Sequence, residues 1–238
     1  MYKMEREITY SQVRQDLKID MAEIAQFFQD CVLVQSEIIG RGVGYTTKAH
    51  RAWFLSSWQI EVDRYPEFME HIVVRTWPYE FKSMYGYRNF EMIDAEGKQI
   101  ARANSIWLHM DVENMRPIKP TEEDVKGYDL EPAIEMEYAP RKIKMLGEEC
   151  RQKLLSEEPV VVKRSFLDSN NHVNNGRYVK ESMDYLPEDK VITKLRVDYR
   201  KAATLSDKMY PSVYVSGDIC QVVFADAERS PFVIVEVM

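Results

Sequence analysis

The chain has 238 residues, of which 45% are hydrophobic and 30% are charged, and its formal net charge is -7. This composition is typical of an ordinary globular protein, and the length suffices for one large domain or two domains of about 100 residues. The negative charge argues against a nucleic acid partner. No apolar run approaches the ~20 residues that a membrane-spanning helix needs, so no membrane partner is predicted.

The cysteines and histidines argue against several classes of site. Cys31, Cys150 and Cys220 are widely spaced and form no CxxC pair, so neither a disulfide framework nor a zinc site is predicted. The four histidines are scattered and no HExxH motif is present, so we predict no metal and no cofactor. Residues 1–7 have none of the features of a signal or transit peptide, and a cytoplasmic location is expected.

The first half of the chain reads as one helix followed by several strands. Asp20 and Glu23 form an aspartate version of a capping box, and apolar residues then recur on one helical face until about Gly40. A hairpin turn is predicted at residues 95–98. Strand patterns lie at residues 53–63, 71–77, 84–93 and 99–112. This order predicts a helix packed against an antiparallel sheet.

The glycine-rich segment at residues 40–44 has the spacing of a nucleotide-binding loop. It follows a predicted helix rather than a strand, so it lacks the context that a dinucleotide-binding fingerprint requires. We interpret it as a helix C-cap followed by a turn.

The second half repeats the plan after a connecting segment. Between residues 113 and 159 the prolines at 117, 120, 132 and 140 interrupt acidic, aperiodic sequence, which we expect to run over the surface. A strand at residues 160–166, a polar motif and a helix follow, and then strands at 191–200, 209–215, 220–224 and 232–237. We therefore predict the fold class α+β with two tandem domains, at residues 1–135 and at residues 136–238, the second carrying the motif.

The motif at residues 168–178 reads DSNNHVNNGRY. In an extended segment, side chains at alternate positions project to the same face, so Asp168, Asn170 and His172 are predicted to converge on one substrate atom. A carboxylate, an amide and an imidazole at one point are typical of a catalytic site.

A helix is predicted directly after this group, with Asn174 or Asn175 as its N-cap. A helix N-terminus presents unpaired N–H groups and the positive end of a dipole, and both stabilise an oxygen that becomes negative during a reaction. The alternative is that these polar residues only form a turn and a cap. A cap needs one such residue, not a run that includes a histidine, so a catalytic role is favoured.

The pattern Asp-x-Asn-x-His-Val-Asn-Asn-x-x-Tyr resembles the signature of acyl-acyl carrier protein thioesterases, whose plant and bacterial members have two fused hotdog domains. A looser version occurs in single-hotdog acyl-CoA thioesterases. Four segments of the first half are also similar to the N-terminal half of the family, at residues 53–66, 88–90, 94–97 and 103–107. The resemblance covers most of the chain and implies a double hotdog, in which each of two antiparallel sheets wraps a helix.

The resemblance implies a thioesterase that hydrolyses fatty acyl-acyl carrier protein in fatty acid biosynthesis. By position, Asp168 would orient or activate water or attack the carbonyl itself, Asn170 would orient water or substrate, and His172 would act as general base or charge-stabilising donor. The backbone N–H groups of Val173 and Asn174 are the predicted oxyanion donors. In the family the acyl chain lies in an apolar tunnel, which the first helix and the strand aromatics would line here.

The chain departs from the plant members at one place. They carry a Glu-Cys pair after Tyr-Arg-Arg, and the matching residues here are Ala202 and Ala203, so a cysteine nucleophile is excluded. Asp198 would lie about 13 Å from Ala202 along a strand and is not expected to replace the glutamate. Two alternatives therefore stay open: an acyl-CoA thioesterase, and a catalytically weakened acyl-binding protein. A hotdog dehydratase is disfavoured because no hydroxyacyl-specific acid and base are identified.

The partner prediction rests on charge. Residues 163–208 contain ten Lys or Arg and seven Asp or Glu, a local excess of positive charge in a negative chain. Carrier proteins of the family are acidic, so the candidate docking residues are Arg177, Lys180, Lys194, Arg200 and Lys201. The alternative is ordinary solvated surface charge. Two fused hotdogs already form the pair that single-hotdog proteins make by dimerising, so we expect a monomer or a homodimer.

Overall fold

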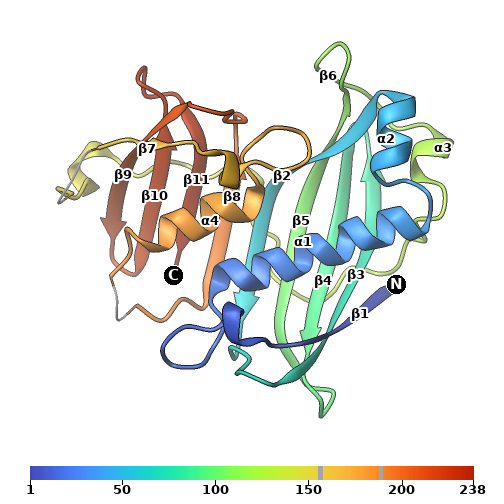
Figure 1. Cartoon of the computed structure of the whole chain (residues 1–238), viewed down its shortest axis with the longest axis horizontal. Coiled ribbons are helices and arrows are strands. Elements are labelled where there is room, and N and C mark those ends of the chain that lie inside the picture. The colour runs from blue at the N-terminus through green and yellow to red at the C-terminus, as the bar shows by residue number, and fades with distance from the viewer. Residues whose placement is uncertain (155–157, 188–189) are drawn as a thin grey trace. The chain divides into compact units, whose positions relative to one another are not determined.

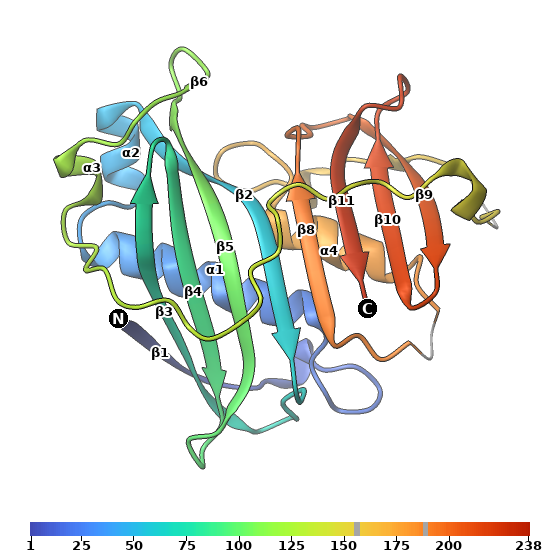
Figure 2. The ribbon, with the colours of Figure 1, turned by 180° about the vertical axis from the view of Figure 1, so that it is seen from behind.

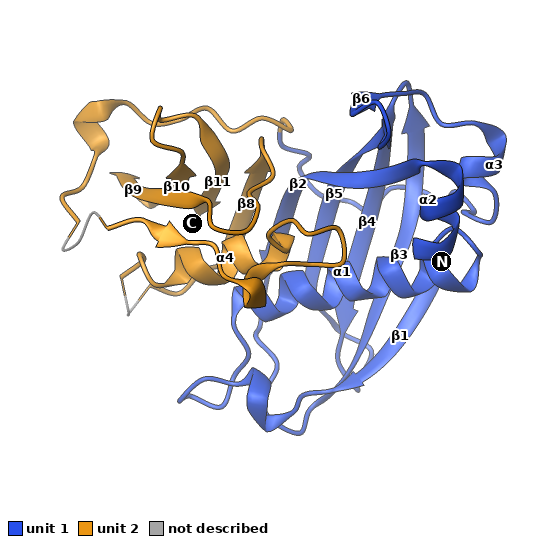
Figure 3. Cartoon of the chain, turned by 45° about the horizontal axis from the view of Figure 1, so that its top comes forward, with its two compact units in different colours: residues 1–139 blue, residues 140–238 orange. Residues whose placement is uncertain are grey.

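The computed structural model describes residues 1–154, 158–187 and 190–238 (Figure 1). The chain divides into an N-terminal unit, Met1–Ala139, and a C-terminal unit, Pro140–Met238 (Figure 3). The division falls after Ala139, compared with residue 135 in the sequence-based prediction. In the part of the chain that the structure describes, no helix is long and apolar enough to span a membrane.

The N-terminal unit is a long helix on an antiparallel sheet with the strand order β1-β3-β4-β5-β2. Figures 1 and 2 show α1 (Met21–Ile38) crossing one face of this sheet. The strands are β1 (Tyr2–Glu7), β2 (Arg51–Val62), β3 (His71–Lys82), β4 (Tyr85–Ile93) and β5 (Gln99–Asp111). The short elements are a 3-10 turn (Tyr10–Gln12), α2 (Val43–Ala49), β6 (Arg116–Pro117), which pairs with β5, and α3 (Glu122–Val125).

Helix α1 begins as the sequence predicts, because the Asp20 carboxylate accepts a hydrogen bond from Glu23 N at 2.9 Å. Its apolar face packs on the sheet through three aromatic rings. The Phe28 ring centroid lies 5.2 Å from that of Phe90 and 6.2 Å from that of Trp58, and the last two are 4.9 Å apart. All three side chains are buried, so this cluster forms the centre of the core between α1 and the sheet.

The glycine-rich segment after α1 ends one helix and starts another. Gly40 has φ +71°, a left-handed conformation that glycine adopts without steric cost, and Gly42 is the N-cap of α2. The interpretation as a helix end and turn is confirmed, whereas α2 was not predicted.

The C-terminal unit has the strand order β8-β11-β10-β9-β7, with α4 (Asn175–Met183) against the sheet. Its strands are β7 (Val160–Val161), β8 (Lys194–Tyr199), β9 (Lys208–Ser216), β10 (Ile219–Ala225) and β11 (Pro231–Val237). Two 3-10 turns complete the unit, at Glu148–Cys150 and Arg164–Phe166. The predicted strand at 160–166 is therefore wrong beyond Val161, because the chain turns there towards the motif.

The segment between the last strand of the first sheet and β7 covers the sheet faces opposite the helices. In the N-terminal unit, Asn89 Oδ1 accepts hydrogen bonds from Ile134 N at 3.2 Å and from Tyr138 OH at 3.1 Å. In the C-terminal unit, Gln221 Oε1 accepts from Leu146 N at 2.9 Å. The predicted surface connection is thus fixed to both sheets by side chains that satisfy its backbone.

Candidate active site

The motif forms a tight loop rather than an extended strand. Leu167 pairs with Val173, and Asp168 N donates to His172 O at 2.8 Å, which closes the loop between them. Asn171 has φ 59°, a left-handed conformation that asparagine tolerates better than most residues. The alternation of side chains assumed from the sequence does not hold in such a turn, so that argument for the convergence of Asp168, Asn170 and His172 is wrong.

The Asp168 carboxylate organises this loop. Its Oδ1 accepts hydrogen bonds from Asn170 N at 2.8 Å and from His172 N at 3.3 Å. Asp168 and His172 are half-buried and Asn170 is exposed. No described residue hydrogen-bonds to the Asn170 amide, the His172 ring or Asp168 Oδ2. One loop therefore presents a carboxylate oxygen, an amide and an imidazole without partners in the described part of the chain.

Helix α4 begins directly after the loop. Asn174 is its N-cap and accepts a hydrogen bond from Gly176 N at 2.8 Å, as predicted. The two predicted oxyanion donors are already engaged: Val173 N donates to Ala203 O and Asn174 N donates to Phe166 O, each at 2.9 Å. An N–H group carries a single proton, so these bonds contradict the predicted oxyanion role of Val173 and Asn174.

The next amide of α4 is the better candidate. Among the described residues, none accepts a hydrogen bond from Asn175 N, which occupies the first helical position. The sequence does not single out this amide, because Asn174 and Asn175 both qualify as N-cap. Once Asn174 is fixed as the cap, the unpaired amide at the positive end of the helix dipole is that of Asn175.

The last residue of the motif anchors the segment that carries the two alanines. Tyr178 OH accepts a hydrogen bond from Ala203 N at 3.0 Å, and burial raises the pKa of Tyr178 to about 12. Ala203 is completely buried and its carbonyl receives Val173 N, whereas Ala202 is exposed. Position 202 therefore lies in a segment bonded directly to the residue that closes the motif loop. A larger side chain fits at 202 and not at 203.

Asp198 has a structural role in β8. Its side chain is 2% exposed, and Oδ2 accepts from Ile143 N at 3.2 Å and from Arg200 Nε at 2.9 Å. A carboxylate with these partners is not available to activate water, as expected from its distance along the strand.

Arg177, Arg200 and Lys201 make ion pairs within the C-terminal unit. The Arg177 guanidinium lies 4.0 Å from the Phe166 ring centroid and 2.6 Å from the Glu181 carboxylate. Arg200 bonds to Asp198, and Lys201 Nζ lies 3.0 Å from the Asp226 carboxylate. Lys180 on α4 and Lys194 on β8 are both exposed. These ion pairs reduce the positive charge that Arg177, Arg200 and Lys201 present to a partner protein.

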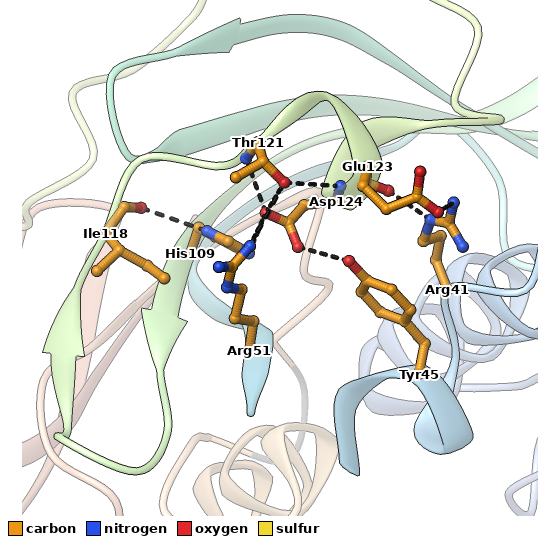
Figure 4. Close-up of polar contacts among 8 residues, drawn as sticks. All are labelled: Arg41, Tyr45, Arg51, His109, Ile118, Thr121, Glu123 and Asp124. Atoms are coloured by element: carbon orange, nitrogen blue, oxygen red, sulfur yellow. Dashed lines mark hydrogen bonds and ion pairs between the residues drawn. The ribbon is translucent and has the colours of Figure 1, made fainter. Parts of the chain in front are cut away.

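A second polar cluster, centred on Asp124, lies in the N-terminal unit (Figure 4). The Asp124 carboxylate is 2.7 Å from Tyr45 OH and 3.1 Å from Arg51 Nη1. It also accepts from Thr121 N at 2.7 Å, and His109 Nε2 lies 3.9 Å away. Thr121 and Asp124 form a capping box for α3, so a signal for part of the cluster was present in the sequence but was not used.

The geometry of this second cluster is that of a structural clamp. The side chains of Asp124 and His109 are 1% and 2% exposed, and His109 Nδ1 lies 3.3 Å from Ile118 O. Burial lowers the pKa of His109, which favours the neutral imidazole. Hydrogen bonds to Asp124 join α2 and β2 to α3, and His109 of β5 lies beside them. The buried groups of this cluster have no access to a substrate.

Comparison with known proteins identifies the family of the chain. Residues 1–128 match the family model of the acyl-ACP thioesterase N-terminal domain, and residues 149–223 match that of the C-terminal domain. The chain belongs to the acyl-ACP thioesterase family. In the described residues of this thioesterase family member, no three His, Cys, Asp or Glu side chains are grouped to hold a metal ion.

Two curated plant relatives illustrate the similarity. Oleoyl-acyl carrier protein thioesterase 2, chloroplastic, of Arabidopsis thaliana is 27% identical over 173 residues, which cover 67% of this chain and 46% of the relative. Palmitoyl-acyl carrier protein thioesterase, chloroplastic, of Gossypium hirsutum is 27% identical over 178 residues, covering 69% of this chain and 42% of the relative. The chain thus spans about half the length of the curated relatives that it matches.

Two solved structures share the fold. An acyl-ACP thioesterase from Bacteroides thetaiotaomicron superposes with a TM-score of 0.88 at 21% identity, covering 99% of this chain and 96% of that chain. The 12:0-ACP thioesterase from Umbellularia californica gives a TM-score of 0.86 at 18% identity, covering 99% and 95%. The predicted α+β double hotdog is confirmed.

The Asp124 cluster predicts a specific loss of stability. Burial acts to raise the pKa of Asp124, but hydrogen bonds from Thr121 and Tyr45 outweigh it and lower the pKa to about 2. A folded-state pKa below the unfolded value stabilises the fold above about pH 4, and this contribution disappears as the pH falls towards 2. We expect Asp124→Asn to lower the free energy of unfolding by about 2 kcal/mol at pH 7.

Urea denaturation at pH 7 and at pH 3 measures this effect. The difference between the intact chain and Asp124→Asn should shrink at the lower pH. Asp129→Asn, at an exposed position of the same segment, is the matched control and should change little at either pH. Equal destabilisation by both variants, or a difference independent of pH, would contradict the assignment.

Proposed function

We propose that the protein hydrolyses the thioester of a fatty acyl-acyl carrier protein to a free fatty acid and the carrier protein. Family membership supports the reaction class. The observation that carries the proposal is the loop at the start of α4, which presents Asp168, Asn170 and His172 with polar atoms that no described residue engages. The plant relatives named above are thioesterases of this substrate class by their names, and the proposal extends that class to this chain.

The loop geometry supports a water-mediated mechanism. Asp168 Oδ1 holds the loop amides, so Oδ2 is the oxygen that can orient or activate water, or attack the carbonyl directly. His172 would accept the proton of the attacking water, and Asn170 would hold water or substrate by hydrogen bonds. When the tetrahedral intermediate collapses, the C–S bond breaks and the thiolate leaves, which needs little protonation because a thiol has a pKa near 8.5.

The oxyanion of that intermediate requires donors at the start of α4. We assign this role to the Asn175 amide in place of Val173 and Asn174, because the latter two already donate to carbonyl groups. The positive end of the helix dipole would add to this stabilisation.

The catalytic assignment predicts different effects of two substitutions at one position. Asp168→Asn keeps the Oδ1 acceptor for the loop amides but removes the charge, whereas Asp168→Ala removes both. We expect each variant, and also His172→Ala, to lower kcat by at least ~100-fold with a smaller change in KM. The measurement is thiol release from acyl-acyl carrier protein, with Asp184→Ala at an exposed position as control.

The same series separates catalysis from loop structure. Near-normal turnover by Asp168→Asn together with loss in Asp168→Ala would mean that the carboxylate only shapes the loop. No hydrolysis by a folded, acyl-binding intact chain would instead favour the second candidate, an acyl-binding protein in which Ala202 and Ala203 mark lost catalysis.

Position 202 offers a gain-of-function test. Ala202 is exposed, and its neighbour Ala203 is hydrogen-bonded to Val173 and Tyr178 of the motif. We therefore expect a glutamate at position 202 to place a second carboxylate near the loop. We expect Ala202→Glu to raise kcat, since this residue type stands there in the plant members that the motif resembles. Ala202→Gln is the uncharged control. An equal response of the two variants would show that charge at this position is not used.

The carrier protein as partner is tested by salt. If basic residues such as Lys180 and Lys194 dock an acidic carrier, kcat/KM should fall several-fold between low and physiological ionic strength. An uncharged acyl-N-acetylcysteamine thioester of equal chain length should show a flat profile. Faster hydrolysis of acyl-CoA than of the carrier substrate would favour the acyl-CoA thioesterase alternative.

A cytoplasmic location and a monomeric or homodimeric state are parts of this proposal that rest on the sequence alone.

A further inference from the structure

The N-terminal unit contains a buried arginine that has no carboxylate partner. Arg88 is 5% exposed and lies on β4, on the face that carries Phe90 towards α1. Its Nη1 donates to Gln35 Oε1 at 2.6 Å and to Thr76 Oγ1 at 3.0 Å. In the described part of the chain no acidic side chain lies within ion-pair distance of it.

The donors of Arg88 are only partly used. A guanidinium has five N–H groups in a planar fork, and here Nε and Nη2 donate to no described residue. The Tyr128 ring, 5.3 Å from Arg88 Cζ, contributes a cation–π contact and no charge. Burial lowers the pKa of Arg88 to about 10, so the group remains charged at neutral pH. A buried charge with neutral partners alone is energetically costly.

Arg88 also marks a boundary in the layer beneath α1. On one side lies the apolar cluster of Phe28, Trp58 and Phe90. On the other side aromatic rings close the layer at Gly86, where an added Cβ would lie 3.1 Å from the Trp53 ring and 3.2 Å from the Phe81 ring. The charge therefore stands at the end of the apolar cluster, and no described acidic side chain pairs with it.

We propose that Nε and Nη2 of Arg88 bind a carboxylate oxygen of a long-chain ligand whose hydrocarbon part packs among the aromatic residues beneath α1. The ligand class is an acyl chain with a carboxylate at its far end, or a fatty acid that enters carboxylate first. This inference rests on the proposed function for the long-chain ligand, but its test measures binding and not hydrolysis.

Four probes of one chain length distinguish the two possible sources of the carboxylate, the far end of an acyl chain and the head group of a fatty acid. Monomethyl dodecanedioate has an ester at one end and a carboxylate at the other, methyl dodecanoate lacks the carboxylate, and dodecanoate has only the head carboxylate. A charge-assisted pair with a buried guanidinium should make monomethyl dodecanedioate bind at least ~10-fold tighter than methyl dodecanoate to the intact chain. Dodecanol, which is neutral, should bind no tighter than methyl dodecanoate.

The variants assign any preference to Arg88. Arg88→Met replaces the charge with an apolar chain of similar reach and should abolish the preference while leaving methyl dodecanoate binding unchanged or tighter. Arg88→Lys keeps the charge without the planar fork and should retain only part of it. Dodecanoate bound as tightly as monomethyl dodecanedioate, and weakened by Arg88→Met, identifies the fatty acid as the carboxylate source.

The proposal has outcomes that overturn it. Equal binding of monomethyl dodecanedioate and methyl dodecanoate by the intact chain refutes it, and this comparison requires no variant to fold. A preference that persists in Arg88→Met refutes the assignment to Arg88. Failure of the proposed thioesterase activity is recognised separately, because it leaves these binding ratios unchanged.

Discussion

Each unit of the protein depends on burying both faces of an antiparallel sheet. A helix covers one face of each sheet. In the N-terminal unit, α1 packs on the strands beneath it through the ring cluster around Phe28. The other face is covered by aperiodic chain, whose backbone needs hydrogen-bond partners once water is excluded. The side chains of Asn89 and Gln221 supply these hydrogen bonds from the two sheets. This role explains why both strands carry a buried polar residue at a position where an apolar residue is more common.

The same requirement shapes the candidate active site. The loop at Asp168 is short, and hydrogen bonds connect its end to Ala203 and Phe166. Most of its backbone N–H groups therefore donate to acceptors that hold the turn and the start of α4 in place. What is left for chemistry is small and specific: one carboxylate oxygen, an amide, an imidazole and the first amide of the helix. Ala203 N donates to Tyr178 OH, so the segment that carries Ala202 is hydrogen-bonded to the last residue of the motif.

Two buried polar groups in the N-terminal unit show opposite solutions to the cost of desolvation. Asp124 is compensated by hydroxyl, amide and guanidinium donors from α2, β2 and the N-cap of α3, and it acts as a clamp. Among the described residues, Arg88 hydrogen-bonds to an amide oxygen and a hydroxyl and contacts an aromatic ring, and it pairs with no carboxylate. A satisfied network stabilises the fold, whereas a partly satisfied cation keeps binding capacity for a ligand.

The sequence by itself determined the features that depend on neighbours along the chain. The helix after Asp20, most of the strands, the cap at Asn174 and the family signature of the motif all follow from local periodicity and residue type. Only the tertiary structure decided how the motif folds, because Asn171 adopts a left-handed conformation and the amides of Val173 and Asn174 bind carbonyl groups of other segments. The Asp124 clamp and the uncompensated charge of Arg88 likewise arise from residues far apart in the sequence. Hydrogen bonds and burial between such segments leave no periodic trace in the chain, and they are what assign each polar group to structure or to chemistry.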